Sequence, residues 1–238
     1  DFMEAGVPGG EIFLKTLGQD HPYYATVLNN LADLYVNLDK YSLAEKYYIN
    51  ALEIREIVLG KQHIGYIESL IRLINLYSVT DQCKKSIPLI QKAIPEFRDI
   101  LDNKFTFLST TEKEKYIDNY HEAIDRLFYS IYKCQMTHEG LKGQATDLCL
   151  WLKNSILRSS DIMRRNIITC NDTLLLKKYD KWMDLNRELS QLYSQQPSER
   201  KANAENLRAK CVEIEKEIIH YSSEKNILFQ KDYSWKDI

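Results

Sequence analysis

Cysteine and histidine are the residue types of this chain with the widest chemistry, and one pair of them stands at a helical spacing. Cys134 and His138 are four positions apart, which would place a thiol and an imidazole on one face of a helix. Such a pair could contribute to a metal site or act as nucleophile and base. As a metal site it offers only two ligands, and no second cysteine or histidine pair stands nearby in the sequence. The pattern therefore favours a semi-buried thiol beside a histidine at the end of a helix.

The other sequence patterns that would indicate catalysis are missing. Gln144-Ala145 begins the Gln-Ala-Cys-x-Gly pattern of one class of cysteine peptidases, but Thr146 stands where the nucleophilic cysteine would be. His21 and His63 each precede a helical segment and have no partner in the sequence that would make them general bases. No glycine-rich loop that could cradle a phosphate is present in the sequence. We therefore predict that the chain is not an enzyme and that it binds no cofactor and no metal.

A period of 42 residues (59 − 17) organises the first hundred positions. The pattern Leu-Gly-x-x-His occurs at 17–21 and returns at 59–63. The pairs between them that keep the same spacing are Leu28 and Leu70, Leu31 and Leu73, Leu34 and Leu76, Tyr35 and Tyr77, and Ala51 and Ala93. A fixed period of about 20–50 residues indicates a repeat architecture in which each repeat is one supersecondary unit.

Each repeat is predicted to be a hairpin of two helices. In the first half, apolar residues recur at helical spacing, while Asp20 and Pro22 suit the cap and the first turn of the helix. The second half carries Ala44 and Ala51, which are small enough to let two helices approach closely, with Tyr48 between them. Such a hairpin cannot bury its apolar face alone, so it must stack on its neighbours.

The residues of the first repeat form a specific pattern. They are Leu31-Ala32, Tyr35, Tyr41, Ala44, Tyr48 and Ala51-Leu52, framed by Leu-Gly-x-x-His-Pro. This pattern resembles the tetratricopeptide repeat, in the 42-residue form of kinesin light chains and many bacterial regulators. The second repeat departs from it, with Cys83, Ser86 and Ile90 at the positions of Tyr41, Ala44 and Tyr48, and with Pro88 and Pro95 in its second helix. The resemblance implies a helical solenoid whose partner is a protein or a peptide.

The helices after the repeats are expected to be longer. Ser109 and Glu112 form a capping box for a helix that should run to about Met136, and a more apolar helix is expected over about 146–168. Heptad-like seams in the last two segments predict a long antiparallel hairpin that turns near Pro197. The seam residues are Leu175, Tyr179, Trp182 and Leu189 in one arm and Leu207, Ile214, Ile218 and Tyr221 in the other.

The expected fold class is all-α: a solenoid of tetratricopeptide-type hairpins, followed by longer helices that end in the antiparallel hairpin. The expected division of the chain is a tail with the end of a preceding repeat at 1–19, two repeats at 20–101, connecting helices that continue the solenoid at 102–171, the hairpin at 172–229, and the start of a linker at 230–238.

Several segments of the second half carry a further resemblance. They are Leu108-Ser109, Glu112-Lys113, Leu157-Arg158-Ser159, the hairpin at 172–229 and Trp235-Lys236-Asp237-Ile238. They resemble the helical region that follows the repeats in bacterial proteins ending in a caspase-like CHAT peptidase domain. The resemblance implies a fragment that precedes such a domain and a non-catalytic scaffold that regulates or positions it in cis.

The expected binding surface is the concave face lined by the first helix of each repeat. Its candidate residues are the polar ones that point away from the apolar stripe: Thr26, Asn29, Asn30, Asp33, Asn37, Glu68, Arg72 and Asn75. The resemblance implies that some of these asparagines hold peptide backbone amides, because an amide can both donate and accept a hydrogen bond. Asn29 and Asp33 stand where a chaperone-type carboxylate clamp needs lysine, which argues against carboxylate capture. The alternative, that these residues are only solvated, remains open.

A basic cluster supports an alternative function. Residues 141–178 contain seven lysines and arginines against three aspartates, a surplus of four positive charges (7 − 3). Its candidate residues are Lys153, Arg158, Arg164, Arg165, Lys177 and Lys178. A nucleic-acid-binding adaptor could use them, but aromatic residues are not interleaved among them, so a solvated helix face or a contact with another domain is favoured.

The composition of the chain predicts the state of its cysteines, its compartment and its relation to membranes. An odd number of widely spaced cysteines, five in 238 residues, predicts reduced thiols in a cytoplasmic protein rather than a disulfide framework. No run of the sequence approaches the length of a membrane-spanning helix, and no signal peptide is visible. We expect a monomer with a protein or peptide ligand and no membrane partner.

Overall fold

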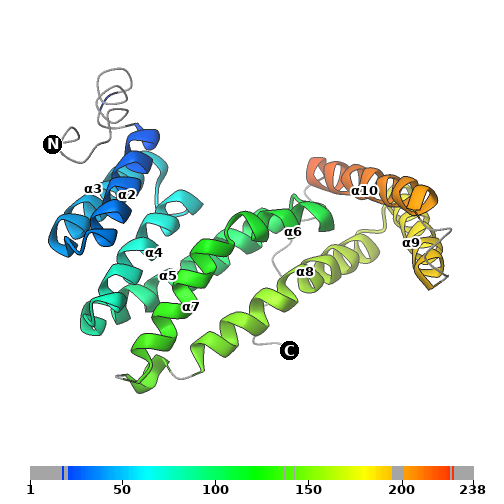
Figure 1. Cartoon of the computed structure of the whole chain (residues 1–238). Helices are drawn as coiled ribbons and strands as arrows, with labels where there is room; N and C mark the ends of the chain where they lie inside the picture. The colour runs from blue at the N-terminus through cyan, green and yellow to red at the C-terminus, as the bar shows by residue number, and fades with distance from the viewer. Residues whose placement is uncertain are drawn as a thin grey trace. The chain divides into compact units, whose positions relative to one another are not determined.

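The computed structural model describes residues 18, 21–136, 138–141, 143–194, 201–225 and 227, and within them it confirms the all-α fold class (Figure 1). The helices are α2 (Pro22–Asn37), α3 (Tyr41–Leu59), α4 (Ile64–Val79), α5 (Cys83–Phe105), α6 (Thr110–Asn119), α7 (His121–Cys134), the 3-10 helix η1 (Glu139–Leu141), α8 (Gln144–Thr169), α9 (Thr173–Ser194) and α10 (Lys201–Glu224). The expected tail (apart from Gly18), the turn at Pro197 and the linker at 230–238 lie outside the described residues. No helix in the described part is both long and apolar enough to cross a membrane.

The chain divides into two compact units. Unit 1 comprises residues up to Leu101 together with Asn119–Trp151, and unit 2 comprises Asp102–Asp118 together with residues from Leu152 onward. Residues 102–171, which the sequence treated as one connecting segment, therefore contribute to both units.

In unit 1 the helix boundaries recur with the sequence period. The Nδ1 atoms of His21 and His63 accept hydrogen bonds from the backbone N–H groups two residues later, at 3.2 Å and 3.0 Å, so these histidines cap α2 and α4. The prediction that Asp20 caps the first helix is therefore wrong by one residue. Asp39 and Asp81, which are 42 residues apart (81 − 39), both have φ of 57° in the turns that end α2 and α4. Aspartate tolerates this left-handed conformation better than most residues, so the two turns use the same local chemistry.

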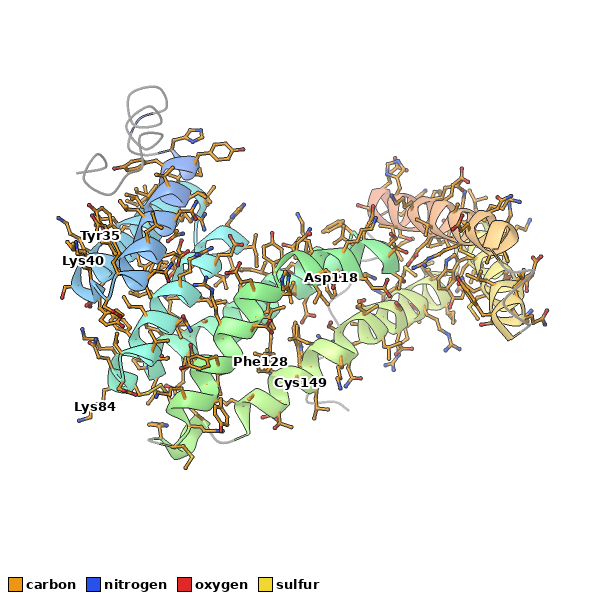
Figure 2. The ribbon with its side chains drawn as sticks, viewed as in Figure 1. Tyr35, Lys40, Lys84, Asp118, Phe128 and Cys149 are labelled. Atoms are coloured by element: carbon orange, nitrogen blue, oxygen red, sulfur yellow. A yellow bond between two sulfur atoms is a disulfide. The ribbon has the colours of Figure 1, made fainter. Side chains whose placement is uncertain are left out.

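The core of unit 1 forms where small and large residues alternate between helices. Ala44 of α3 is fully buried, and Tyr48, one turn later, is 1 % exposed. The cluster that joins α2, α3 and α4 consists of Leu31, Ala32, Tyr35, Ala44, Tyr48, Leu73, Leu76 and Tyr77. Because α2 and α3 meet at alanines, they approach closely while tyrosines fill the space beside them. Tyr35 of α2 is one of these tyrosines and is labelled in Figure 2.

Two of the predicted helix boundaries are wrong. The single helix expected from Ser109 to about Met136 is interrupted at Tyr120, where α6 ends and α7 begins. Asp118-Asn119 precede the break, and aspartate and asparagine disfavour helix interiors because their side chains compete for backbone hydrogen bonds. The connection expected at 102–108 is also shorter, because α5 continues to Phe105, whose ring is 1 % exposed and packs edge-on against Tyr116 in unit 2.

The hairpin of α9 and α10 provides the apolar core of unit 2. The two helices pack on each other and on the C-terminal part of α8. The buried cluster consists of Met163, Ile167, Leu175, Tyr179, Ile214, Ile218 and Ile219, with Trp182 partly buried against it. Leu175 and Ile218 are fully buried, so both predicted seams contribute to this core.

The N-terminus of α6 is joined to α10 by polar contacts in unit 2. The Ser109 N–H and hydroxyl both donate to Oε2 of Glu112, at 3.0 Å and 2.8 Å. The expected reach of Glu112 back to the cap is therefore confirmed, although the serine hydroxyl donates to the carboxylate. Lys216 of α10 lies 2.7 Å from Oε1 of Glu112, and Glu215 accepts hydrogen bonds from the N–H and hydroxyl of Thr110 at 2.9 Å and 2.8 Å.

Adjacent leucines on α9 offer a matched test of the unit 2 core. Leu175 is fully buried, whereas Leu174 is 50 % exposed. We expect Leu175→Ala to lower the free energy of unfolding by about 2–5 kcal/mol, because it leaves a cavity. Leu174→Ala should cost less than about 1 kcal/mol. Urea denaturation followed by circular dichroism measures both, and equal losses would contradict the described packing.

The contacts of Glu112 predict a pH dependence of stability. The hydrogen bond from Lys216, assisted by those from Ser109, lowers the pKa of Glu112 to about 2 from 4.5. A lowered folded-state pKa gives stabilisation that is complete above about pH 4.5 and is lost as the pH falls toward 2. The shift corresponds to about 3 kcal/mol, which solvent screening of this partly exposed carboxylate reduces to about 1 kcal/mol.

We therefore expect Glu112→Gln to be less stable than the natural chain at pH 7 and nearly equal to it at pH 2.5, as measured by urea denaturation at each pH. Glu213→Gln, at an exposed position of α10, is the control and should leave the pH profile unchanged. A constant difference between Glu112→Gln and the natural chain at every pH would contradict this assignment.

Candidate functional site

Three helices of unit 1 each contribute one charged residue to a single network. α4 contacts both α2 and α7, and these helices carry Asp33 (α2), Arg72 (α4) and Arg126 (α7). The Asp33 carboxylate pairs with the Arg72 guanidinium, lies 3.4 Å from Arg126 Nη1, and accepts a hydrogen bond from the Tyr48 hydroxyl. The three charged side chains are 24–28 % exposed, so they are held more firmly than surface ion pairs while remaining accessible.

Tyr48 supports this network from the second helix of the first repeat. Its burial and its hydrogen bond to Asp33 raise the pKa of Tyr48. The phenol therefore stays protonated at neutral pH and remains a donor to the carboxylate. Glu122 adds a further pair with Arg126, at 2.7 Å.

A small pocket of about 50 Å³ lies beside the network, between α4 and the start of α7. We call the surface around it the first-helix face, defined by Asp33, Glu68, Arg72, Glu122 and Arg126. The residues that line the pocket are Glu68, Ile71 and Arg72, together with Asn119, Tyr120, Glu122, Ala123 and Arg126. The face therefore offers two guanidinium groups and three carboxylates that can pair with charged or polar groups of a ligand.

The sequence identified only part of this face. It selected Asp33, Glu68 and Arg72, but it missed Glu122 and Arg126 because α7 lacks the repeat pattern. The apolar residues Ile124, Leu127 and Ile131 of α7 are all buried. Their helical spacing in the sequence was the signal that could have placed the charged residues between them, such as Arg126, on the accessible side of α7.

The remaining candidate residues from the sequence differ in how accessible they are to a ligand. Asn30 and Asn37 are exposed, and Asn75 is half-buried. Asn29 is 1 % exposed and its Nδ2 donates to Ser69 Oγ at 2.9 Å, so it joins α2 to α4 and is not accessible to a ligand. Thr26, although exposed, accepts a hydrogen bond from Arg55 at 2.9 Å.

Arg55 is a buried charge that the sequence did not single out. Its guanidinium also donates to the carbonyl oxygen of Gly65 at 2.6 Å and lies 3.4 Å from Glu68. Burial lowers the pKa of Arg55, and the nearby Glu68 opposes that shift. Arg55 thereby links α3 to both first helices and fixes the side chain of Glu68 on the first-helix face.

Two of the five cysteines are joined in a disulfide. Cys83 and Cys134 form a disulfide with a Cα–Cα distance of 5.4 Å, although both were expected to be reduced. They are 51 positions apart, and only the packing of unit 1 brings the start of α5 to the end of α7. His138 is exposed and its Nδ1 accepts from the Gly140 N–H at 3.1 Å, so it caps η1. Cys149, Cys170 and Cys211 are free thiols.

The basic cluster of the alternative function is partly neutralised. Arg158 lies 2.7 Å from Asp102, Arg165 lies 2.7 Å from Asp161, and Lys178 pairs with Glu217. Lys153, Arg164 and Lys177 are exposed. Because carboxylates already neutralise three of the six cations, this surface offers fewer charges for phosphate contacts than the sequence count implied.

The fold of the described residues defines an α-helical repeat protein. Residues 23–96 match the family model described as tetratricopeptide repeat, which supports a tetratricopeptide-repeat protein. Such repeats indicate a scaffold for protein–protein interaction and are generally non-catalytic. A search of curated proteins found no match to the chain.

Asp33 has three partners, so its removal tests the network. We expect Asp33→Ala to lower the free energy of unfolding by about 2–3 kcal/mol, because Tyr48, Arg72 and Arg126 lose a shared acceptor. Asp125→Ala, at an exposed position of α7, is the control and should change stability by less than about 0.5 kcal/mol. Thermal and urea denaturation measure both variants, and a neutral Asp33→Ala would mean that the network does not hold the helices together.

Proposed function

We propose that unit 1 binds a segment of another protein along the first-helix face, which corresponds to the concave face of a tetratricopeptide solenoid. The single observation that supports this is the network in which Asp33 of α2, Arg72 of α4 and Arg126 of α7 meet beside a pocket. Side chains that are fixed before binding lose little conformational entropy when a ligand arrives. The charged side chains of this face are therefore already ordered for binding polar groups of a ligand.

Two exposed amides and one half-buried amide extend this face along the first helices. We assign to Asn30, Asn37 and Asn75 the role of hydrogen-bonding the ligand backbone, since each amide offers both donors and an acceptor. Glu68, Arg72 and Arg126 supply charge pairs to ligand side chains. The ligand is therefore a polar, extended or helical peptide segment, and apolar burial contributes less than hydrogen bonding and charge.

A displayed library of random peptides, selected against the natural chain, provides the test. We expect the dissociation constants of the selected peptides to increase at least about tenfold in Arg72→Gln and in Asn75→Ala, because each variant removes a direct partner of the ligand. Lys46→Gln, at an exposed position of α3, is the matched control and should bind as the natural chain does. Selected peptides that bind all three variants equally would place the binding surface elsewhere.

A second part of the proposal concerns the arrangement of the longer protein. We propose that the repeats act as a monomeric cytoplasmic scaffold that regulates or positions an adjoining caspase-like peptidase. The support is the resemblance of Leu108-Ser109, Leu157-Arg158-Ser159 and the hairpin at 172–229 to the helical region that precedes CHAT domains. The reading frame downstream of Ile238 tests this part, and we expect a His-Gly and a Cys-Gly motif in it. Their absence would remove the peptidase from the proposal and leave the peptide-binding face untouched.

A further inference from the structure

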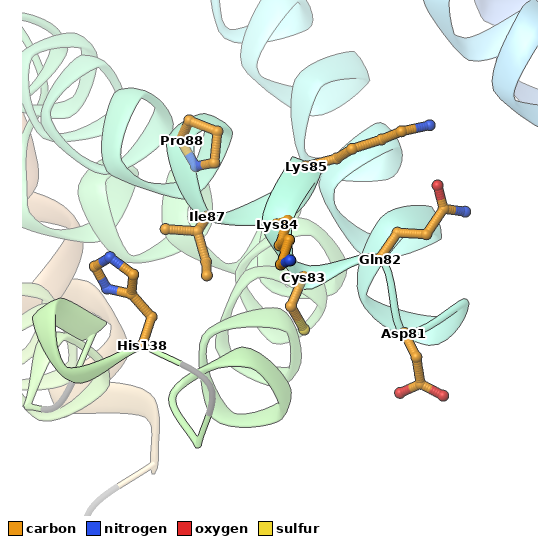
Figure 3. A pocket seen from close by; sticks show the side chains of 8 residues that line it. All are labelled: Asp81, Gln82, Cys83, Lys84, Lys85, Ile87, Pro88 and His138. Atoms are coloured by element: carbon orange, nitrogen blue, oxygen red, sulfur yellow. The ribbon is translucent and has the colours of Figure 1, made fainter.

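A second, larger pocket opens at the end of unit 1 that carries the disulfide. Its volume is about 760 Å³, within the range of small-molecule sites. The turn after α4 and the first residues of α5 line most of it, and His138 completes it from before η1 (Figure 3). The lining residues are Asp81, Gln82, Cys83, Lys84, Lys85, Ile87, Pro88 and His138. The side chain of Cys83 is thus part of the pocket wall.

We propose that Cys83 is a site of thiol–disulfide exchange, at which a small thiol bearing carboxylate groups binds in this pocket and forms a mixed disulfide. Neither the peptide-binding face nor the tetratricopeptide fold requires this chemistry. Disulfides of cytoplasmic proteins are mostly transient and redox-sensing, so this bond is compatible with the proposed location.

The two sulfurs differ in their access to a nucleophile. Cys83 is 8 % exposed and lines the pocket, whereas Cys134 is fully buried. A thiolate entering the pocket therefore reaches the sulfur of Cys83, and the sulfur of Cys134 is the leaving group. The Ser78 hydroxyl lies 3.7 Å from the Cys134 sulfur, close enough to reorient toward the departing thiolate.

The charges around the pocket favour an anionic thiol. Lys84 projects into solvent at the start of α5 (Figure 2), and Lys85 lies 3.1 Å from Glu45. Lys133 lies 3.0 Å from Asp81, so three lysines face two carboxylates at this end of the unit. The net positive charge attracts both the thiolate and the carboxylates of such a molecule.

The exchange is balanced in atoms and electrons. The incoming thiolate forms a bond to the Cys83 sulfur while the Cys83–Cys134 bond breaks, and the electron pair leaves with Cys134, which takes a proton from water. A second thiolate attacks the small-molecule sulfur of the mixed disulfide, releasing the Cys83 thiolate and the disulfide of the small thiol. The protein thereby gains two electrons, and two small thiols are oxidised.

Exchange also removes a covalent restraint on α7. The disulfide joins the start of α5 to the last residue of α7, the helix that carries Arg126 eight residues earlier (134 − 126). Cleavage enlarges the set of conformations open to the unfolded chain, so we expect the melting temperature to fall by about 5–10 °C. An effect on ligand affinity through Arg126 rests on the proposed function, whereas the exchange itself does not.

The experiment measures reduction of the oxidised full chain by three probe thiols at equal thiolate concentrations. The probes are reduced glutathione, neutral 2-mercaptoethanol and cationic cysteamine. We expect glutathione to react at least about fivefold faster than cysteamine, with a ratio that shrinks as salt is added. Lys84→Glu should reduce this ratio, while Lys104→Glu, at an exposed position near the end of α5, should preserve it.

Peptide mapping by mass spectrometry identifies the sulfur that is attacked. Cys134→Ser, treated with oxidised glutathione, should carry the adduct on Cys83, whereas Cys83→Ser should remain unmodified at Cys134 until it is unfolded. An adduct on Cys134 of the folded chain, a faster reaction with cysteamine, or reduction only after denaturation would overturn the proposal. None of these measurements uses a peptide ligand, so they stand apart from the test of the first-helix face.

Discussion

Close approach of helices at alanine is the constraint on which unit 1 depends. Ala25 and Ala32 of α2 and Ala44 and Ala51 of α3 are all fully buried, so the two helices of the first repeat meet without a bulky side chain between them. The tyrosines and leucines of the cluster around Tyr48 then fill the space at the sides. A larger residue at any of these alanines would separate the helices, because a close-packed core has little room to adjust. The short separation of α2 and α3 within the first repeat follows from this contact.

α7 packs on the first helix of the second repeat, although its sequence does not follow the repeat pattern. It packs on α4 through its buried apolar residues, and it brings Arg126 to a carboxylate of α2 that lies 93 positions earlier (126 − 33). The same packing brings its last residue, Cys134, to the start of α5. α7 therefore contributes Arg126 to the network around Asp33 and Cys134 to the disulfide. This helix connects the disulfide to the first-helix face, because it carries both Cys134 and Arg126.

Unit 2 is stabilised by a different balance of interactions. Its apolar cluster is formed by α8, α9 and α10, while α6 is attached through charged groups. Glu215 is 3 % exposed, yet its carboxylate accepts from the backbone and hydroxyl of Thr110. Lys113, 2 % exposed, lies near the same carboxylate; burial lowers the pKa of Lys113, and Glu215 opposes this shift. A buried carboxylate with these partners is tolerated because each hydrogen bond offsets part of its desolvation.

The sequence alone determined the helical class, the repeat and most helix boundaries, because spacing, caps and turn residues act over a few positions. The helix starts at His21 and His63 and the buried alanines follow directly from such local patterns. Contacts between distant positions were decided only by the tertiary structure. The pairing of Asp33 with Arg126, the burial of Asn29 and the bond between Cys83 and Cys134 depend on how α4, α5 and α7 pack, which no local pattern specifies. The residues that the sequence failed to identify in unit 1 lie mostly on α7. This helix packs on α4 with a buried apolar stripe alone, so its sequence carries no repeat pattern that would have marked them.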